Sequence, residues 1–180
     1  MSYILIGSSE HNANIAAKYI DNNFNSGSKL VKEHWDESLP FKNNFIINEI
    51  PLYDYDSTSK IQSISIALSN SDGMFISSKR LFGTIPRLDE RYPLSTNYYY
   101  KLFDGSLGFE LLKNQSKDLE FFGVTYFSDP FNRVKNLNFE KENKSKFNIN
   151  LGWTDESFSV YDRPEIFIFK NSKNLTSEAV

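Results

Sequence analysis

The sequence predicts a Rossmann-like α/β domain, in which a mainly parallel sheet is covered by helices and an antiparallel β-hairpin follows at the C-terminal end. The first observation is the order strand, helix, strand across Phe45–Ile50, Thr58–Ser69 and Met74–Ile76, which is typical of a parallel sheet. A further apolar strand, Lys29–Val31, precedes this unit. The second observation is that Glu165–Phe169 alternates Ile and Phe, so both of its faces are apolar and it should not lie at an open edge.

The first element in the chain is a predicted helix over Asn12–Phe24. Apolar side chains recur at helical spacing on one face of it, at Ile15, Ala16, Tyr19 and Ile20. The polar segment Asn25–Ser28 ends the helix and leads into the first strand.

The second helix begins after a turn at Asp54–Ser57 that can cap it, and it runs to about Ser69. We expect Ile61, Ile64 and Leu68 to form its buried face.

After the loop Lys79–Pro93, the pattern predicts a helix over Leu94–Phe103 and strands over Phe109–Leu112 and Phe121–Phe127. The C-terminal hairpin would pair Ser157–Tyr161 with the strand that ends at Phe169.

The whole of 1–170 therefore forms one predicted domain. Residues 129–150 are rich in Asn and Lys and are expected to form a polar insertion, whereas 171–180 are expected to be a frayed tail.

Composition excludes several classes of function. The chain has 180 residues, no cysteine and a net charge of −3, which exclude a thiolate site or disulfide scaffold and argue against nucleic acid as a partner. His11 and His34 are not at metal-ligand spacing and no glycine-rich phosphate loop is present, so we expect neither a metal nor a cofactor. No apolar run reaches the ~20 residues that span a bilayer, so the chain as it stands is expected to be soluble.

Aromatic residues make up 16% of the chain, which has two interpretations. They could form platforms for sugar rings or lipid headgroups, or they could simply build a core rich in phenylalanine.

The polar cluster Glu33, His34, Trp35 and Asp36 follows the first predicted strand. Ligands of open α/β sheets bind beyond the carboxyl ends of strands, and two carboxylates beside an indole could hold a sugar. Alternatively, Trp35 belongs to the core and the acids are solvated.

Two further clusters lie in the second half of the chain. Arg80 and Arg87 could clamp a phosphate, or they could form salt bridges within their long loop. Tyr92 precedes Tyr98, Tyr99 and a third tyrosine on a short helix, where at least one ring should point outward toward a lipid headgroup or a partner domain.

Parallel strands bring their carboxyl ends to one edge of a sheet. We therefore predict that Glu33, Trp35 and Asp36 converge with Arg80 and Arg87 on one rim, where an arginine–carboxylate pair could order the loop or bind a ligand.

Several segments, in order along Ala16–Phe169, carry a family resemblance: Lys32–Pro40, Leu52–Asp54, Ile76–Leu88, Arg91–Tyr99, Leu102–Leu111 and Glu156–Pro164. They resemble the soluble C-terminal domain of bacterial multi-spanning glycosyltransferases related to dolichyl-phosphate-mannose protein mannosyltransferases. One position departs from the family pattern, since Arg163 stands where these proteins usually have a histidine.

The resemblance implies a non-catalytic domain that docks onto the membrane-embedded part of a parent glycosyltransferase or binds its acceptor, with a glycan or lipid-linked sugar nearby. Attached to such a parent, it would lie on the extracytoplasmic face of a bacterial cytoplasmic membrane. In such enzymes catalysis belongs to the membrane part, so no catalytic residue carries over. Two alternatives stay open: a stand-alone module that binds carbohydrate or cell-envelope polymer, and a soluble enzyme with a site near Glu33 and Asp36.

Overall fold

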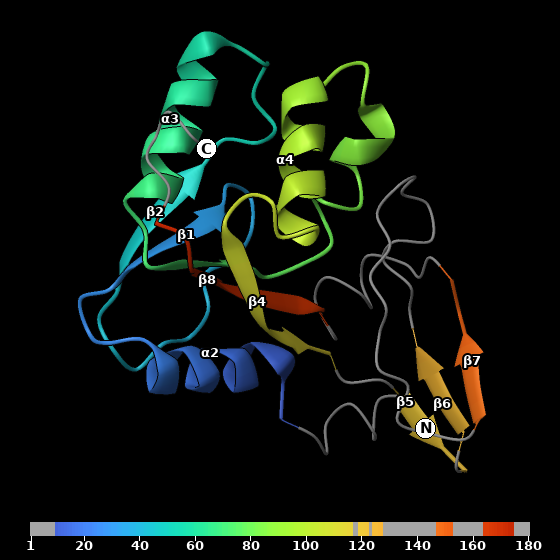
Figure 1. The fold of residues 1–180 in the computed structure, drawn as a ribbon. Helices are drawn as coiled ribbons and strands as arrows, with labels where there is room; N and C mark the ends of the chain where they lie inside the picture. The colour runs from blue at the N-terminus through green and yellow to red at the C-terminus, as the bar shows by residue number, and fades with distance from the viewer. Residues whose placement is uncertain (1–9, 117–118, 123, 128–146, 153–163, 175–180) are drawn as a thin grey trace.

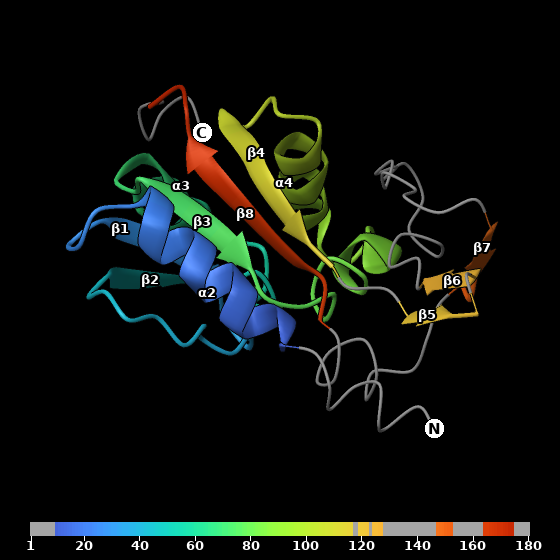
Figure 2. The ribbon, with the colours of Figure 1, turned by 90° about the horizontal axis from the view of Figure 1, so that it is seen from below.

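The computed structural model describes residues 10–116, 119–122, 124–127, 147–152 and 164–174. Its centre is a five-stranded sheet in the order β2-β1-β3-β8-β4. Helix α2 covers one face of this sheet, and helices α3 and α4 cover the other (Figure 1, Figure 2). The predicted α/β class with a mainly parallel core and covering helices is therefore confirmed in outline.

Three neighbouring strands of the sheet pair in parallel, as predicted. Strand β1 (Lys29–Glu33) pairs with β2 (Ile46–Ile50) on one side and with β3 (Gly73–Ile76) on the other. The sheet as a whole is mixed, because β8 (Ile166–Asn171) runs antiparallel to both β3 and β4 (Phe109–Gln115).

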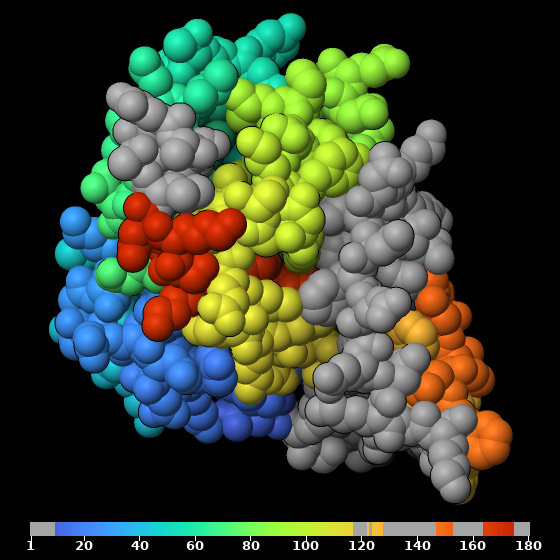
Figure 3. All heavy atoms as spheres, in the orientation of Figure 1, coloured from blue at the N-terminus to red at the C-terminus, as the bar shows by residue number. Residues whose placement is uncertain are grey.

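Strand β8 occupies the position between β3 and β4, and four of its residues, Ile166–Phe169, are buried apolar side chains. The prediction that this segment avoids an open edge is confirmed. Both of its edges are taken by β3 and β4, while the expected hairpin partner, 157–161, lies outside the described residues. In Figure 3 the last described residues, in red, reach the surface beside α2 and β4.

The helices begin and end close to the predicted residues. Helix α2 spans Asn12–Asn23, α3 spans Thr58–Ser69 and α4 spans Pro93–Phe103, with a short 3-10 helix, η1, over Ile85–Leu88. Ser57 caps α3 by accepting a hydrogen bond from the Lys60 amide, as the sequence suggested. Within the described residues, no helix is both long and apolar enough to cross a bilayer.

The predicted buried face of α3 is wrong at one position. Ile64 and Leu68 are buried, but Ile61 is 47% exposed, and the neighbouring Lys60 is buried instead. A lysine can occupy a core position here because its ammonium group is surrounded by hydrogen-bond acceptors.

Lys60 ties the loop after β2 to helix α4. Its Nζ atom donates to the carbonyl oxygens of Leu52 and Asp54, to Asp56 Oδ1 and to Ser95 Oγ, at 2.7–2.8 Å. The other Asp56 oxygen, Oδ2, accepts from the Leu94 amide in the first turn of α4 at 2.8 Å. The Lys60–Asp56 pair thus satisfies a helix end that has no side-chain cap of its own.

A small second sheet contains β5 (Leu119–Phe121), β6 (Val124–Phe127) and β7 (Phe147–Asn150). The prediction of a single strand over Phe121–Phe127 is wrong, because Phe122 has a φ of 50° and the chain turns back there. β7 falls in the predicted insertion 129–150, most of which lies outside the described residues.

Gly73, at the start of β3, allows the sheet and α2 to approach closely. A Cβ atom at this position would lie 2.6 Å from the Phe169 carbonyl oxygen and 2.7 Å from the Phe24 ring. The first of these contacts is with backbone, which cannot swing away.

We therefore expect Gly73→Ala to lower the free energy of unfolding by about 1–3 kcal/mol, the usual effect of overpacking a core. Urea unfolding of the purified chain measures this. Gly27→Ala is not a matched control, because Gly27 has a φ of 89°; Ser28→Ala, nearby in the same loop, serves instead. An unchanged midpoint for Gly73→Ala would contradict the close contact.

Candidate functional site

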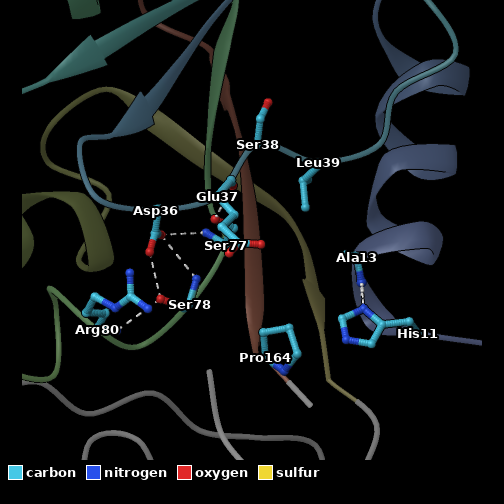
Figure 4. Close-up of a pocket in the computed structure, with 10 residues that line it drawn as sticks. All are labelled: His11, Ala13, Asp36, Glu37, Ser38, Leu39, Ser77, Ser78, Arg80 and Pro164. Atoms are coloured by element: carbon cyan, nitrogen blue, oxygen red, sulfur yellow. Dashed lines mark hydrogen bonds between the residues drawn. The ribbon is translucent and has the colours of Figure 1, made fainter. Parts of the chain in front are cut away.

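Two chain segments meet at the carboxyl ends of the parallel strands β1 and β3. We call them together the rim: residues 33–38 and residues 77–80 (Figure 4). The predicted convergence of these two segments is confirmed, because hydrogen bonds connect them directly.

Asp36 connects the two segments of the rim through hydrogen bonds. Its side chain accepts hydrogen bonds from the Ser77 amide at 3.0 Å, the Ser78 amide at 3.2 Å and the Ser78 hydroxyl at 2.7 Å. Burial raises the pKa of the Asp36 carboxyl, and the hydrogen bonds from Ser78 and Ser77 oppose that rise. Asp36 is 4% exposed, so it is a structural acceptor rather than an accessible acid or base.

Trp35 projects from a tight turn at the rim. The Asp36 amide donates to the Glu33 carbonyl oxygen at 3.3 Å, and Trp35 has a φ of 76°, a conformation that favours glycine. For an L-residue other than glycine, this conformation costs roughly 1–2 kcal/mol. Arg80 holds the turn by donating from a guanidinium nitrogen to the Trp35 carbonyl oxygen at 2.7 Å.

The sequence left open whether Trp35 is buried and the acids are solvated. The structure shows the reverse arrangement: Trp35 is 62% exposed, whereas Glu33 and Asp36 are buried. The indole therefore packs little against the protein, although its backbone is held firmly.

A second polar group lies beside the indole. His34 Nδ1 is 2.8 Å from Glu49 Oε2, and Lys32 Nζ is 2.9 Å from Glu49 Oε1. Lys32 also donates to the Asp36 carbonyl oxygen at 2.8 Å. The His34 ring meets the Trp35 ring edge-on, with 5.5 Å between their centroids.

The hydrogen bonds from Lys32 and His34 lower the pKa of Glu49, so it stays charged. Its side chain remains 44% exposed. It is thus a fixed, accessible hydrogen-bond acceptor.

A small cavity of ≈ 90 Å³ opens between the rim and the start of α2. Figure 4 shows the residues around it, among them His11, Ser38, Ser77 and Pro164. The first amides of α2 do not offer an anion site, because Ala13 donates to the His11 ring and the next two amides donate to the His11 carbonyl oxygen.

The side chain of Glu33, the first residue of the rim, is fully buried. Burial raises its pKa well above the usual range, the charge of Asp36 adds to this rise, and the Tyr99 hydroxyl opposes it only in part. Both carboxylate oxygens and the Tyr99 hydroxyl lack a well-formed hydrogen bond within the described part of the chain. Glu33 therefore favours its neutral form in the folded protein.

This burial predicts a pH dependence of stability. The pKa of the Glu33 carboxyl is higher in the folded than in the unfolded state, so the folded protein keeps this carboxyl protonated up to a higher pH. The free energy of unfolding therefore falls as the pH rises above the unfolded pKa of about 4.3. We expect Glu33→Gln to reduce the loss of unfolding free energy between pH 5 and pH 8, measured by urea unfolding. Glu37→Gln, an exposed rim residue, is the control. An equal pH dependence in Glu33→Gln and the wild type would contradict the prediction.

The remaining predicted site residues divide into two groups. Arg87 lies on η1 with an exposed side chain. Tyr92, Tyr98 and Tyr99 are buried in the core, so these three rings do not face a lipid headgroup or a partner. Tyr100, the third tyrosine of the helix, is half-buried, so the prediction that at least one of these rings points outward rests on Tyr100 alone. Both Tyr98 and Tyr99 belong to the core cluster that α4 shares with strands β3 and β8, and the Tyr98 hydroxyl donates to Met74 Sδ at 3.5 Å.

Sequence reasoning missed Glu49, Ser77 and Ser78. Glu49 reaches the rim only because the parallel register places it opposite Lys32, which no local pattern reveals. The two serines follow β3 directly, and their backbone amides donate to Asp36. Because every residue except proline has such an amide, the residue types alone do not indicate this role.

No cluster of three or more His, Cys, Asp or Glu side chains suited to a metal ion occurs among the described residues. Comparisons of the chain with protein-family models, curated proteins and solved structures found no match.

Proposed function

We propose that this chain is a non-catalytic domain of a membrane glycosyltransferase that uses a polyprenyl-phosphate-linked sugar, and that the rim is the surface that docks onto the membrane-embedded part or its acceptor. The observation that carries the proposal is the exposed Trp35, presented on a turn fixed by Asp36 and Arg80. The family resemblance of the segments around the rim supplies the enzyme class. A domain of this class would lie on the extracytoplasmic face of the membrane.

The geometry disfavours the alternative of a soluble enzyme with a site near Glu33 and Asp36. Glu33 is 0% exposed, and Asp36 accepts hydrogen bonds from Ser77 and Ser78. A general acid or base must reach the proton that it transfers, and Glu33 lacks that access. Asp36 lines the small cavity, but both of its oxygens already accept hydrogen bonds from Ser77 or Ser78.

A transfer assay tests the absence of catalysis. We expect the purified chain to transfer no sugar from a polyprenyl-phosphate-mannose donor to peptide acceptors. Turnover above a heat-inactivated sample would overturn the non-catalytic assignment.

A crosslinking experiment tests docking. A photoreactive amino acid at Ser38, which is exposed on the rim, is expected to crosslink in cells to a multi-spanning glycosyltransferase segment, identified by mass spectrometry. The same amino acid at Lys18, on the exposed side of α2, is the control and should not do so. Rim crosslinks found only to soluble proteins would contradict docking.

A further inference from the structure

We propose that Trp35, His34 and Glu49 form a binding subsite for a neutral hexose unit, which we call the indole subsite. The inference deepens the proposed function and rests on it, since the hexose would belong to the acceptor. Its basis is the exposure of the indole, the fixation of the carboxylate and the balance of charge around them.

Folding does not account for the indole at position 35. The side chain is 62% exposed, so it contributes little burial, and its φ of 76° is one that glycine adopts without strain. A glycine would complete the same turn at lower cost. Strained residues that the surrounding structure holds in place are concentrated at binding sites.

Hydrogen bonds fix the backbone turn from which the Trp35 ring projects. Arg80 bonds to the carbonyl oxygen of Trp35, and Asp36, the next residue, is anchored to Ser77 and Ser78. Because the backbone of the turn is already fixed, binding the C–H face of a pyranose ring would require ordering of the side chain alone.

Glu49 supplies the polar partner that such a ligand needs. Lys32 and His34 each hold one of its carboxylate oxygens, at 2.9 Å and 2.8 Å, yet its side chain remains 44% exposed. Each carboxylate oxygen has further lone pairs, which can accept hydrogen bonds from sugar hydroxyls. His34 contacts both Glu49 and the Trp35 ring, so the apolar surface and the acceptor are neighbours.

The charges around the subsite favour a neutral ligand. Lys32 and Arg80 are cationic, but Glu49 is paired with Lys32, and Glu37 adds a second exposed carboxylate next to the turn. A surface that binds phosphate or an anionic membrane would need an excess of positive charge. Hydroxyl-rich, uncharged sugar rings match this balanced surface better.

The test is a titration of the purified chain with mannotriose, cellotriose and triacetylchitotriose, all uncharged. Binding is followed by saturation-transfer NMR and by the indole N–H signals in a ¹H–¹⁵N spectrum. We expect at least one trisaccharide to bind with a millimolar dissociation constant and to shift one indole signal. Trp35→Ala should weaken this binding at least ten-fold, and Glu49→Gln several-fold. Tyr55→Ala, which removes another exposed aromatic ring, should have no effect.

Trp35→Gly provides a second readout that a purely structural role would not give. It should abolish sugar binding and give a higher melting temperature than Trp35→Ala, because both variants lack the indole but only glycine adopts a φ of 76° without strain. A melting temperature for Trp35→Gly below that of Trp35→Ala would show that the turn is not strained at position 35, and this would overturn the inference.

Absence of saturable binding by all three trisaccharides, or binding unchanged in Trp35→Ala, would overturn the indole subsite. Binding of phosphatidylglycerol vesicles that depends on Trp35 would also overturn it, in favour of a membrane surface. If sugar binding fails while Ser38 still crosslinks to the membrane enzyme, only the subsite is wrong and docking stands. If sugar binds but no such crosslink forms, the chain is a carbohydrate-binding module and the proposed docking is wrong.

Discussion

Replacing Lys60 with methionine is expected to lower the free energy of unfolding by about 3–5 kcal/mol, the usual effect of removing one partner of a buried ion pair. The Lys60 side chain is 2% exposed and that of Asp56 is 16% exposed. Methionine has nearly the same length, so the loss would come from the acceptors left behind: the Asp56 carboxylate, two carbonyl oxygens and the Ser95 hydroxyl. Urea unfolding at neutral pH measures the change.

The chain contains a matched control for this prediction. Lys18 forms an ion pair with Glu10 on the surface, with side chains 56% and 42% exposed. Lys18→Met should change stability by less than about 1 kcal/mol, as is usual for exposed pairs. Similar effects of the two lysine substitutions would show that the Lys60 network contributes no more than a surface pair.

The second large effect is expected at Asp36. Asp36→Ala would leave the Ser77 amide, the Ser78 amide and the Ser78 hydroxyl without their acceptor in a buried place. Since each buried polar group left unpaired costs about 1–3 kcal/mol, we expect a loss of at least 3 kcal/mol. Asp36→Asn keeps one acceptor oxygen and should therefore lower the free energy of unfolding by less than Asp36→Ala.

Arg80→Ala tests how much the arginine contributes to the stability of the rim, for which the sequence suggested a pair with a carboxylate. Arg80 donates to a backbone carbonyl oxygen through an exposed hydrogen bond, which is typically worth about 0.5–1.5 kcal/mol. We therefore expect Arg80→Ala to destabilise the protein less than Asp36→Ala, by thermal and urea unfolding alike. An equal or larger effect of Arg80→Ala would show that the guanidinium stabilises the rim more than the hydrogen bonds between Asp36 and the two serines do.

The elements that the sequence predicted well have local signals. Helix α3 matches at both ends, because its cap at Ser57 and its end before Asp72 and Gly73 depend on neighbouring residues alone. The parallel arrangement of β1, β2 and β3 followed in the same way from the order of strands and helix.

Non-local contacts explain what the sequence did not show. Lys60 is buried only because Leu52, Asp54 and Ser95 come together around it, so helical periodicity pointed to Ile61 instead. Trp35 was ambiguous for a similar reason. Hydrophobicity places a tryptophan in the core, whereas the turn that exposes it depends on hydrogen bonds from a distant loop.

The position of β8 has a consequence for how the chain is made. Gly73 pairs with Lys170, and Phe109 pairs with Asn171, so the centre of the sheet joins segments that leave the ribosome far apart in time. Until residues 166–171 emerge, β3 and β4 have no strand between them, and their apolar side chains stay open to solvent or to a chaperone. Folding of the sheet must therefore follow synthesis of nearly all of this sequence, and long-range pairing of this kind closes slowly. A nascent chain stalled before β8 should remain sensitive to protease, whereas one stalled well beyond it should become resistant.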